Sequence, residues 1–194
     1  MSYTTINFPQ FPQYTVFVSL FQGVEKDTLN TVKQELIAGN EDYDFCFLNT
    51  AHLISLEQLY SSIHRAILNF ESGNMRAKTL NTEIIFNLSP VNKIMEALKS
   101  FGVDEKTPNL VAVKVFKSEE LDSNTIIQVN NNLVNLLKVE ECQNLKITDE
   151  LLYKLVDIAK FKKTYKLNDA KISDIDSQGQ LTRLAIADSL LRGL

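Results

Sequence analysis

Arg76 and Lys78, in the run NMRAK, form the first of two clusters of cations in this sequence that could bind a partner, because connections between elements often carry binding residues. The run follows Gly73, a residue suited to end a helix, and precedes an apolar segment, so we expect a connection displayed at the surface. From charge alone, we prefer the interpretation that Arg76 and Lys78 are solvating charges beside a turn.

A second group of cations lies in the run KFKKTYK, where Lys162, Lys163 and Lys166 alternate with Phe161 and Tyr165. Interleaved rings and cations can stack on bases and bind phosphates. The two rings are also four residues apart, which is the spacing of neighbours on one helix face. We therefore prefer the interpretation that both rings belong to the core and that the lysines remain at the surface.

Candidates for catalysis are few. Neither His52 nor His64 accompanies a nucleophile motif, and the sequence contains no GxSxG, GxGxxG or GxxxxGK[ST] run. Cys46 and Cys142 belong to no CxxC or Cys/His cluster, which predicts two reduced, buried thiols. The acidic residues show no metal-binding spacing. The sequence therefore predicts no catalytic site, no metal and no cofactor.

The composition is that of an ordinary globular protein, with 194 residues, 44% hydrophobic and 23% charged. We expect one domain over residues 1–194, large enough to fold without a metal or a disulfide. A net charge of −4 argues against non-specific coating of nucleic acid, but it allows a local basic patch. The sequence has neither a signal-peptide pattern nor an apolar run of membrane-spanning length, so we expect a protein of the cytoplasm or nucleus.

The elements that must position these groups alternate early and become helical later. Strands are expected at residues 14–21, 44–48, 83–88 and 109–116. Helices are expected at residues 25–37, from the Ser55 capping box to Gly73, and at 94–101, 126–137, 148–159 and 177–191. The predicted class is mixed α/β (α+β): a small, mostly antiparallel sheet covered by helices, with a helical C-terminal third.

The helix expected at residues 177–191 carries more apolar residues than a helix lying on one core requires. Its leucines, alanines and isoleucine occupy more than one stripe. Part of this surface is expected to face a partner. A helix wedged deep in its own domain explains the pattern equally well.

The run MRAKTLNTEIIFNLSP, followed by NKIMEALKSFGV, resembles the central region of a known family. KKTYKL at residues 162–167 and FPQYTVFVSLF near the N-terminus are similar to further family segments. The family is that of the Cgi-type small subunits of the EKC/KEOPS complex, called PRPK-binding proteins in animals, and the likeness is to its fungal members. It covers nearly the whole chain and is weakest between residues 122 and 144.

The resemblance implies a non-catalytic subunit that binds the small lobe of the complex's atypical protein kinase/ATPase. The complex adds a threonylcarbamoyl group to the adenosine next to the anticodon of tRNA, and the small subunit is implicated in holding the tRNA acceptor 3′ end. In fungi the complex is also linked to telomere maintenance and transcription. A location in nucleus and cytoplasm, and at telomeres, would follow.

The resemblance also suggests where the partners bind. For the kinase we expect an apolar face on the last helix, formed by Leu184, Ala187, Leu190 and Leu191. For tRNA we expect Asn74, Arg76 and Lys78, followed by Lys162, Lys163 and Lys166. Two alternatives remain open: a small transferase with an unrecognised site, and a protein-interaction adaptor that binds no RNA.

Overall fold

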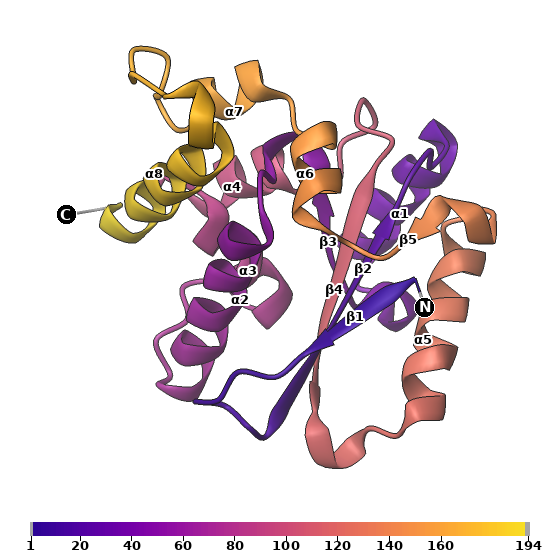
Figure 1. Cartoon of the computed structure of the whole chain (residues 1–194). Coiled ribbons are helices and arrows are strands. Elements are labelled where there is room, and N and C mark those ends of the chain that lie inside the picture. Colours follow the sequence, from indigo (N-terminus) through magenta and orange to yellow (C-terminus); the bar gives the residue numbers. More distant parts are fainter. Residues whose placement is uncertain (1, 193–194) are drawn as a thin grey trace. The chain divides into compact units, whose positions relative to one another are not determined.

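The computed structural model describes residues 2–192, apart from the side chains of Glu120 and Ser123, and it divides the chain into two compact units. The sheet unit comprises Met1–Leu48 and Val103–Ile147, and the helical unit comprises Asn49–Gly102 and Thr148–Leu194. The predicted class, a small antiparallel sheet with helices and a helical C-terminal third, is confirmed (Figure 1). The expectation of one domain over residues 1–194 stays a prediction.

The sheet has the order β1-β2-β4-β3, and a short strand β5 also pairs with β2. The strands are β1 (Tyr3–Ile6), β2 (Tyr14–Phe21), β3 (Cys46–Asn49), β4 (Leu110–Lys117) and β5 (Asn144–Leu145). Strand β2 is central and runs antiparallel to β1, β4 and β5. The expected strands at residues 14–21, 44–48 and 109–116 are thus confirmed, and β1 and β5 are additional.

Two helices complete the core of the sheet unit. They are α1 (Lys26–Ala38) and α5 (Ser123–Leu136), and the short 3₁₀ turns are η1 (Glu41–Tyr43), η3 (Ser118–Glu120) and η4 (Glu141–Gln143). Leu29 and Val32 of α1 and Leu133 of α5 share one buried cluster with Phe17 and Phe21 of β2. The amphipathic spacing seen in the sequence therefore positions both helices.

The two cysteines differ in environment, although both lie in the sheet unit. Cys46 is buried, as predicted, and Cys142 is exposed, so the prediction of a second buried thiol is wrong. Cys142 lies in the short turn η4, which presents the side chain to solvent. Neither cysteine forms a disulfide.

The helical unit contains the remaining elements. They are η2 (Thr50–His52), α2 (Leu56–Glu71), α3 (Leu80–Leu88), α4 (Ile94–Phe101), α6 (Asp149–Leu155), α7 (Ile158–Thr164), η5 (Asp174–Asp176) and α8 (Ser177–Leu191). Helix α3 packs between α2 and α4, and α8 contacts both α2 and α3 (Figure 1). Among the described residues, no helix is both long and apolar enough to cross a bilayer.

The predicted ends of α2 are confirmed. The Ser55 hydroxyl accepts a hydrogen bond from the backbone N–H of Gln58 at 3.2 Å, and Gln58 Oε1 accepts one from the N–H of Ile54 at 2.9 Å. Gly73 follows the helix with a φ of 67°, a left-handed conformation that glycine adopts without a Cβ clash. These contacts set where the connection to α3 begins.

The strand expected at residues 83–88 is wrong, because this segment is helix α3. The Thr79 hydroxyl caps its first turn by accepting from the N–H of Thr82 at 3.2 Å. Ile84, Phe86 and Leu88 are buried, as expected for core residues, together with their neighbours. A short, continuously apolar run has no distinguishing period, so composition alone favours a strand at residues 83–88, which are the buried part of a helix.

The helix expected at residues 148–159 is interrupted. Thr148 caps α6 as predicted, but Asp157 caps a new helix, α7, by accepting from the N–H of Lys160 at 3.0 Å. The core interpretation of Phe161 and Tyr165 is confirmed, since both rings are buried with centroids 4.7 Å apart. The Tyr165 hydroxyl donates to the Leu88 carbonyl at 2.5 Å, which fixes α7 to the end of α3.

Candidate functional site

A fully buried carboxylate organises the connection between α2 and α3. Glu83 of α3 has 0% exposure, and its Oε2 accepts hydrogen bonds from the backbone N–H groups of Arg76 at 3.0 Å and Ala77 at 2.8 Å. Its Oε1 accepts from Asn69 Nδ2 of α2 at 2.7 Å. A buried charge is tolerated only when it is hydrogen-bonded, and here the bonds fix the loop that carries Arg76.

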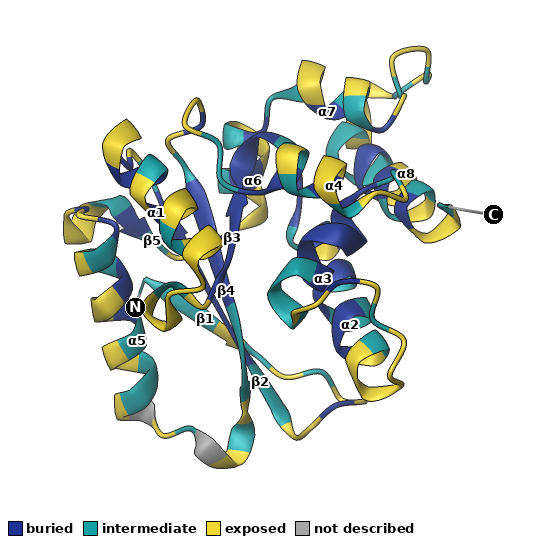
Figure 2. Cartoon of the chain, turned by 180° about the vertical axis from the view of Figure 1, so that it is seen from behind, coloured by how far each residue is buried: buried dark blue, intermediate teal, exposed yellow. Residues whose placement is uncertain are grey.

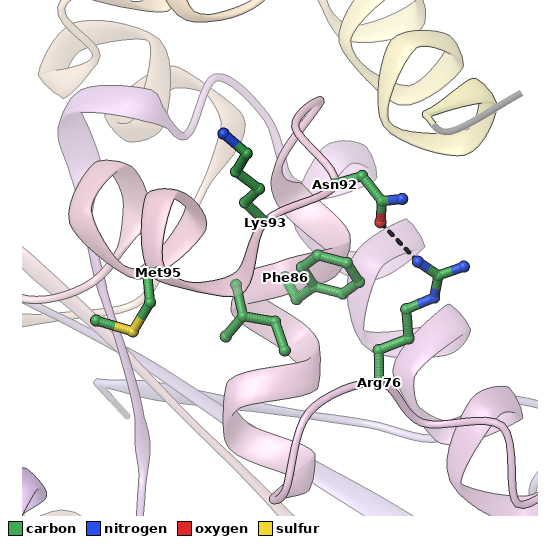
Figure 3. A pocket seen from close by; sticks show the side chains of 6 residues that line it. Arg76, Phe86, Asn92, Lys93 and Met95 are labelled. Atoms are coloured by element: carbon green, nitrogen blue, oxygen red, sulfur yellow. Dashed lines mark hydrogen bonds between the residues drawn. The ribbon is translucent and has the colours of Figure 1, made fainter.

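The Arg76 side chain extends from this loop toward the connection between α3 and α4. Its Nη1 donates to Asn92 Oδ1 at 2.8 Å, as the dashed line in Figure 3 shows. Arg76 and Asn92 are both exposed at the surface of the unit. Two loops that are separate in sequence are thereby joined by one guanidinium.

These groups surround a small polar hollow, which we call the arginine pocket. Its volume is about 160 Å³. The lining residues come from α2, α3, the two connections on either side of α3 and the residue that follows α8: Arg65, Asn69, Asn74, Arg76, Glu83, Phe86, Asn92 and Arg192. Three guanidiniums and one carboxylate leave a net positive charge, which suits an anion with several oxygen atoms.

Arg192, which follows α8, is the most strongly held of the three arginines. Its guanidinium lies 3.7 Å above the Phe86 ring, and Nη2 donates to Asn87 Oδ1 at 2.8 Å. Burial and the nearby Arg65 lower the pKa of Arg192 to about 10, although Glu83 acts in the opposite direction. The side chain therefore remains charged at neutral pH.

A larger hollow of about 490 Å³ adjoins the arginine pocket. Its lining residues are Arg76, Phe86, Asn92, Lys93, Ile94 and Met95, the first three of which also line the arginine pocket (Figure 3). Phe86, Ile94 and Met95 give it apolar walls. A positively charged hollow beside a partly apolar one matches the chemistry of a nucleotide, which joins a phosphate to a flat base.

The outer face of α8 is a second candidate site, formed by Leu184, Ala187, Leu190 and Leu191. The three leucines are 39%, 47% and 60% exposed, in that order along the chain. The opposite side of α8 is buried, with Leu181 at 2% and Ala185 at 1% (Figure 2). The exposed apolar strip on the last helix is therefore confirmed, and its exposure excludes a helix that is covered on every side.

Comparison with known families identifies a match over most of the chain. Residues 21–193 match the family model described as "Kinase binding protein CGI-121". The chain belongs to the CGI-121 family. The matched CGI-121 region includes every residue of the two pockets and of the outer face of α8.

Several curated relatives from yeasts carry the same CGI-121 name. The protein named "EKC/KEOPS complex subunit CGI121" in Debaryomyces hansenii is 55% identical, and the alignment covers 100% of both chains. A protein of that name in Candida albicans is 37% identical over 100% of both chains. A third, from Yarrowia lipolytica, is 33% identical over 97% of this chain and 99% of its own.

The cations singled out in the CGI-121 sequence fall into two groups. Asn74 and Arg76 line the arginine pocket, whereas Lys78 is exposed on the same loop without lining either pocket. The lysines of the α7 region are also outside the two linings; Lys162 is half-buried, and Lys163 and Lys166 are exposed. The tRNA roles assigned to all of these residues stay predictions.

Several pocket residues were not singled out in the sequence: Arg65, Asn69, Glu83, Asn92 and Arg192. Arg65 and Asn69 are four residues apart on α2, a spacing that places them on one helix face. That spacing, together with the cations after Gly73, was the available signal. Arg192 lies more than a hundred residues from Arg76 in sequence, and only the fold brings them together.

Proposed function

We propose that this chain is a non-catalytic subunit of an EKC/KEOPS complex that binds the complex's kinase and helps to recruit tRNA by its acceptor 3′ end. In this role it would support threonylcarbamoyl modification of the adenosine next to the anticodon, in nucleus and cytoplasm. Links to telomeres and transcription belong to the same proposal. The observation that carries it is the arginine pocket with its adjoining hollow, in a chain 55% identical to a relative named as a subunit of that complex.

The kinase-binding part of the proposal rests on the outer face of α8. A face with Leu184, Leu190 and Leu191 exposed offers the apolar contact that anchors protein interfaces. The family description names kinase binding as the shared property. A docked kinase lobe would remove these leucines from water, which is the main source of affinity in such contacts.

Co-purification with the kinase of the same organism tests this part. Leu190→Glu and Leu191→Glu should each abolish stable association, because a charge would be buried against an apolar partner. Ile175→Glu is the matched control, since Ile175 is 97% exposed in η5 and lies outside the outer face of α8. A complex that survives both leucine substitutions would place the kinase elsewhere.

The tRNA part rests on the chemistry of the two hollows. The arginine pocket supplies cations and amides for phosphate oxygens, and the adjoining hollow supplies Ile94 and Met95 for a base. The flexible, single-stranded end of a tRNA has unpaired bases that can enter such hollows. In the double-helical parts of a tRNA the bases are paired and stacked, so they cannot enter these hollows.

Binding measurements with full-length tRNA and with tRNA lacking its terminal CCA test this part. We expect removal of CCA to weaken binding at least about tenfold, and affinity to fall steeply as salt rises, because phosphate contacts release counterions. Equal binding of the two RNAs would exclude the acceptor-end role. It would leave the adaptor without RNA binding as the better description.

An enzyme is the other class of function considered for this chain. Among the described residues that line the two hollows there is no histidine, cysteine, serine or threonine to serve as a nucleophile. Arg192 has a lowered pKa but remains a cation at neutral pH and cannot serve as a base. The groups present favour binding an anion over transforming it.

A further inference from the structure

The C-terminal end of α8 is attached directly to the arginine pocket. Arg192 follows Leu191, the last residue of α8, and its Nη1 donates to the carbonyl oxygens of Phe86 and, at 2.9 Å, Ser89. These carbonyls lie at the end of α3, where the Phe86 oxygen also accepts from the Ser89 N–H at 3.1 Å. Arg192 therefore holds the end of α8 on the end of α3.

A second arginine of the pocket also contacts the last turn of α8. Arg65 of α2 donates from Nη1 to the Ser189 carbonyl at 3.1 Å. Ser189 itself is buried. Arg65 and Arg192 thus link the last turn of α8 to α2 and to the end of α3.

Both arginines keep N–H groups for a ligand. A guanidinium has five N–H donors. The hydrogen bonds described above use three donors of Arg192 and one of Arg65. An anion in the pocket would engage the remaining donors while the carbonyl contacts of α8 and α3 persist.

The charges in the pocket give such an anion a further effect. Arg65 and Arg76 both repel the charge of Arg192, and Glu83 offsets part of this repulsion. A phosphate between them would replace repulsion by attraction. The last turn of α8, which carries Leu190 and Leu191 of its outer face, would then be held more firmly.

We propose that Arg192 is a ligand-binding residue of the arginine pocket, and that through it an RNA phosphate in the pocket and the kinase on the outer face of α8 bind cooperatively. This inference rests on the proposed function, because it takes its two partners from there. Coupling between two binding sites is reciprocal, so each partner raises the affinity for the other by the same factor. We expect a factor of about five to ten.

The first measurement is the dissociation constant of this protein and the kinase, with and without saturating tRNA that ends in CCA. The second is the dissociation constant of this protein and the tRNA, with and without saturating kinase. Arg192→Gln should weaken tRNA binding and reduce the coupling factor to within about twofold of one. Arg183→Gln is the matched control, because Arg183 is an exposed arginine of α8 whose ion pair is with Asp176. The control should retain the full coupling.

Several outcomes would overturn the inference. If wild-type protein binds both partners but neither alters the affinity for the other, the coupling is refuted while the proposed function stands. If Arg192→Gln binds tRNA as tightly as wild type, the role of Arg192 is refuted. Should that variant fail to fold, Arg65→Gln serves instead, and full coupling in it would count against the proposal. Wild-type protein that binds neither partner would refute the proposed function itself.

Discussion

The two units each contain a buried polar cluster, and the two clusters differ in charge and in completeness. In the sheet unit, Asn144 Nδ2 donates to Ser19 Oγ at 2.7 Å, and Asn130 Nδ2 donates to Asn144 Oδ1 at 2.9 Å. Ser19 Oγ lies 3.3 Å from Asn130 Oδ1, which closes a triangle of three buried side chains. None of these groups is charged.

The cluster in the helical unit has the opposite character. Glu83 is charged and buried, and the arginines around it retain donors beyond those used within the protein. A neutral network whose members satisfy one another stabilises a fold and offers nothing to a ligand. A charged cluster with surplus donors is the arrangement of a binding site. The contrast supports the proposal that the cluster of the helical unit is the one that binds a ligand.

Glu83→Ala should destabilise the protein more than the other substitutions below. Three N–H donors would lose a charged partner, and we expect the free energy of unfolding to fall by about 4 kcal/mol. Denaturant unfolding followed by circular dichroism measures it. Glu57→Ala, at an exposed position in the first turn of α2, is the control and should change stability by less than about 1 kcal/mol. A small effect at Glu83 would mean that its carboxylate does not hold the loop.

Asn144→Ala should have the next largest effect. We expect the free energy of unfolding to fall by about 2 kcal/mol, because Ser19 and Asn130 would each lose a hydrogen-bond partner while buried. Burial raises the pKa of the Cys46 thiol and shields it, so this thiol reacts with a disulfide reagent only when the sheet unit opens. Labelling of Cys46 should accelerate in the variant, with the exposed Cys142 as the internal standard. Unchanged labelling would show that the triangle contributes nothing to the stability of the sheet unit.

Arg76→Ala should weaken tRNA binding about tenfold and reduce the slope of affinity against salt by about 0.7, because one phosphate contact is lost. Lys78→Ala, on the same loop but outside both pocket linings, should weaken binding less. Filter binding over a range of potassium chloride concentrations measures both. Equal losses in the two variants would indicate a diffuse basic surface instead of a defined pocket.

Asp188→Asn should have the smallest effect, a slight change in melting temperature. Burial raises the pKa of Asp188 of α8, and the nearby Lys166 lowers it in part. A carboxyl whose pKa is higher in the folded protein favours folding while it is protonated and loses that contribution as pH rises through the folded pKa. The variant should therefore melt slightly above wild type at pH 7 and close to it at pH 3. A lower melting temperature at pH 7 would show that the charge of Asp188 is stabilising.

The sequence predicted most of the fold because its signals were local. Ser55, Thr148 and Gly73 mark helix ends through contacts with residues only a few positions away. The alternation of side chains similarly indicated β2 and β4. Residues 83–88 were misassigned because burial on all sides removes the periodicity that distinguishes a helix from a strand.

Only part of the candidate site could be predicted from the sequence, because the rest depends on contacts between distant residues. Asn74 and Arg76 were evident as polar residues on a loop, whereas Glu83 was hidden within an apolar run and acts through loop amides six and seven residues earlier. Arg192 acquires its role only when α8 returns to the end of α3. Long-range contacts of this kind leave no local pattern in a sequence.

The loop that carries Arg76 is unusual for a surface connection, since the Arg76 and Ala77 amides bond to a fully buried carboxylate. Their amide protons should consequently exchange with deuterium slowly, at rates more typical of a helix than of a loop. A segment that is already ordered loses little conformational entropy when a ligand arrives. Association would therefore be limited by the encounter with the RNA end, and not by rearrangement of the protein.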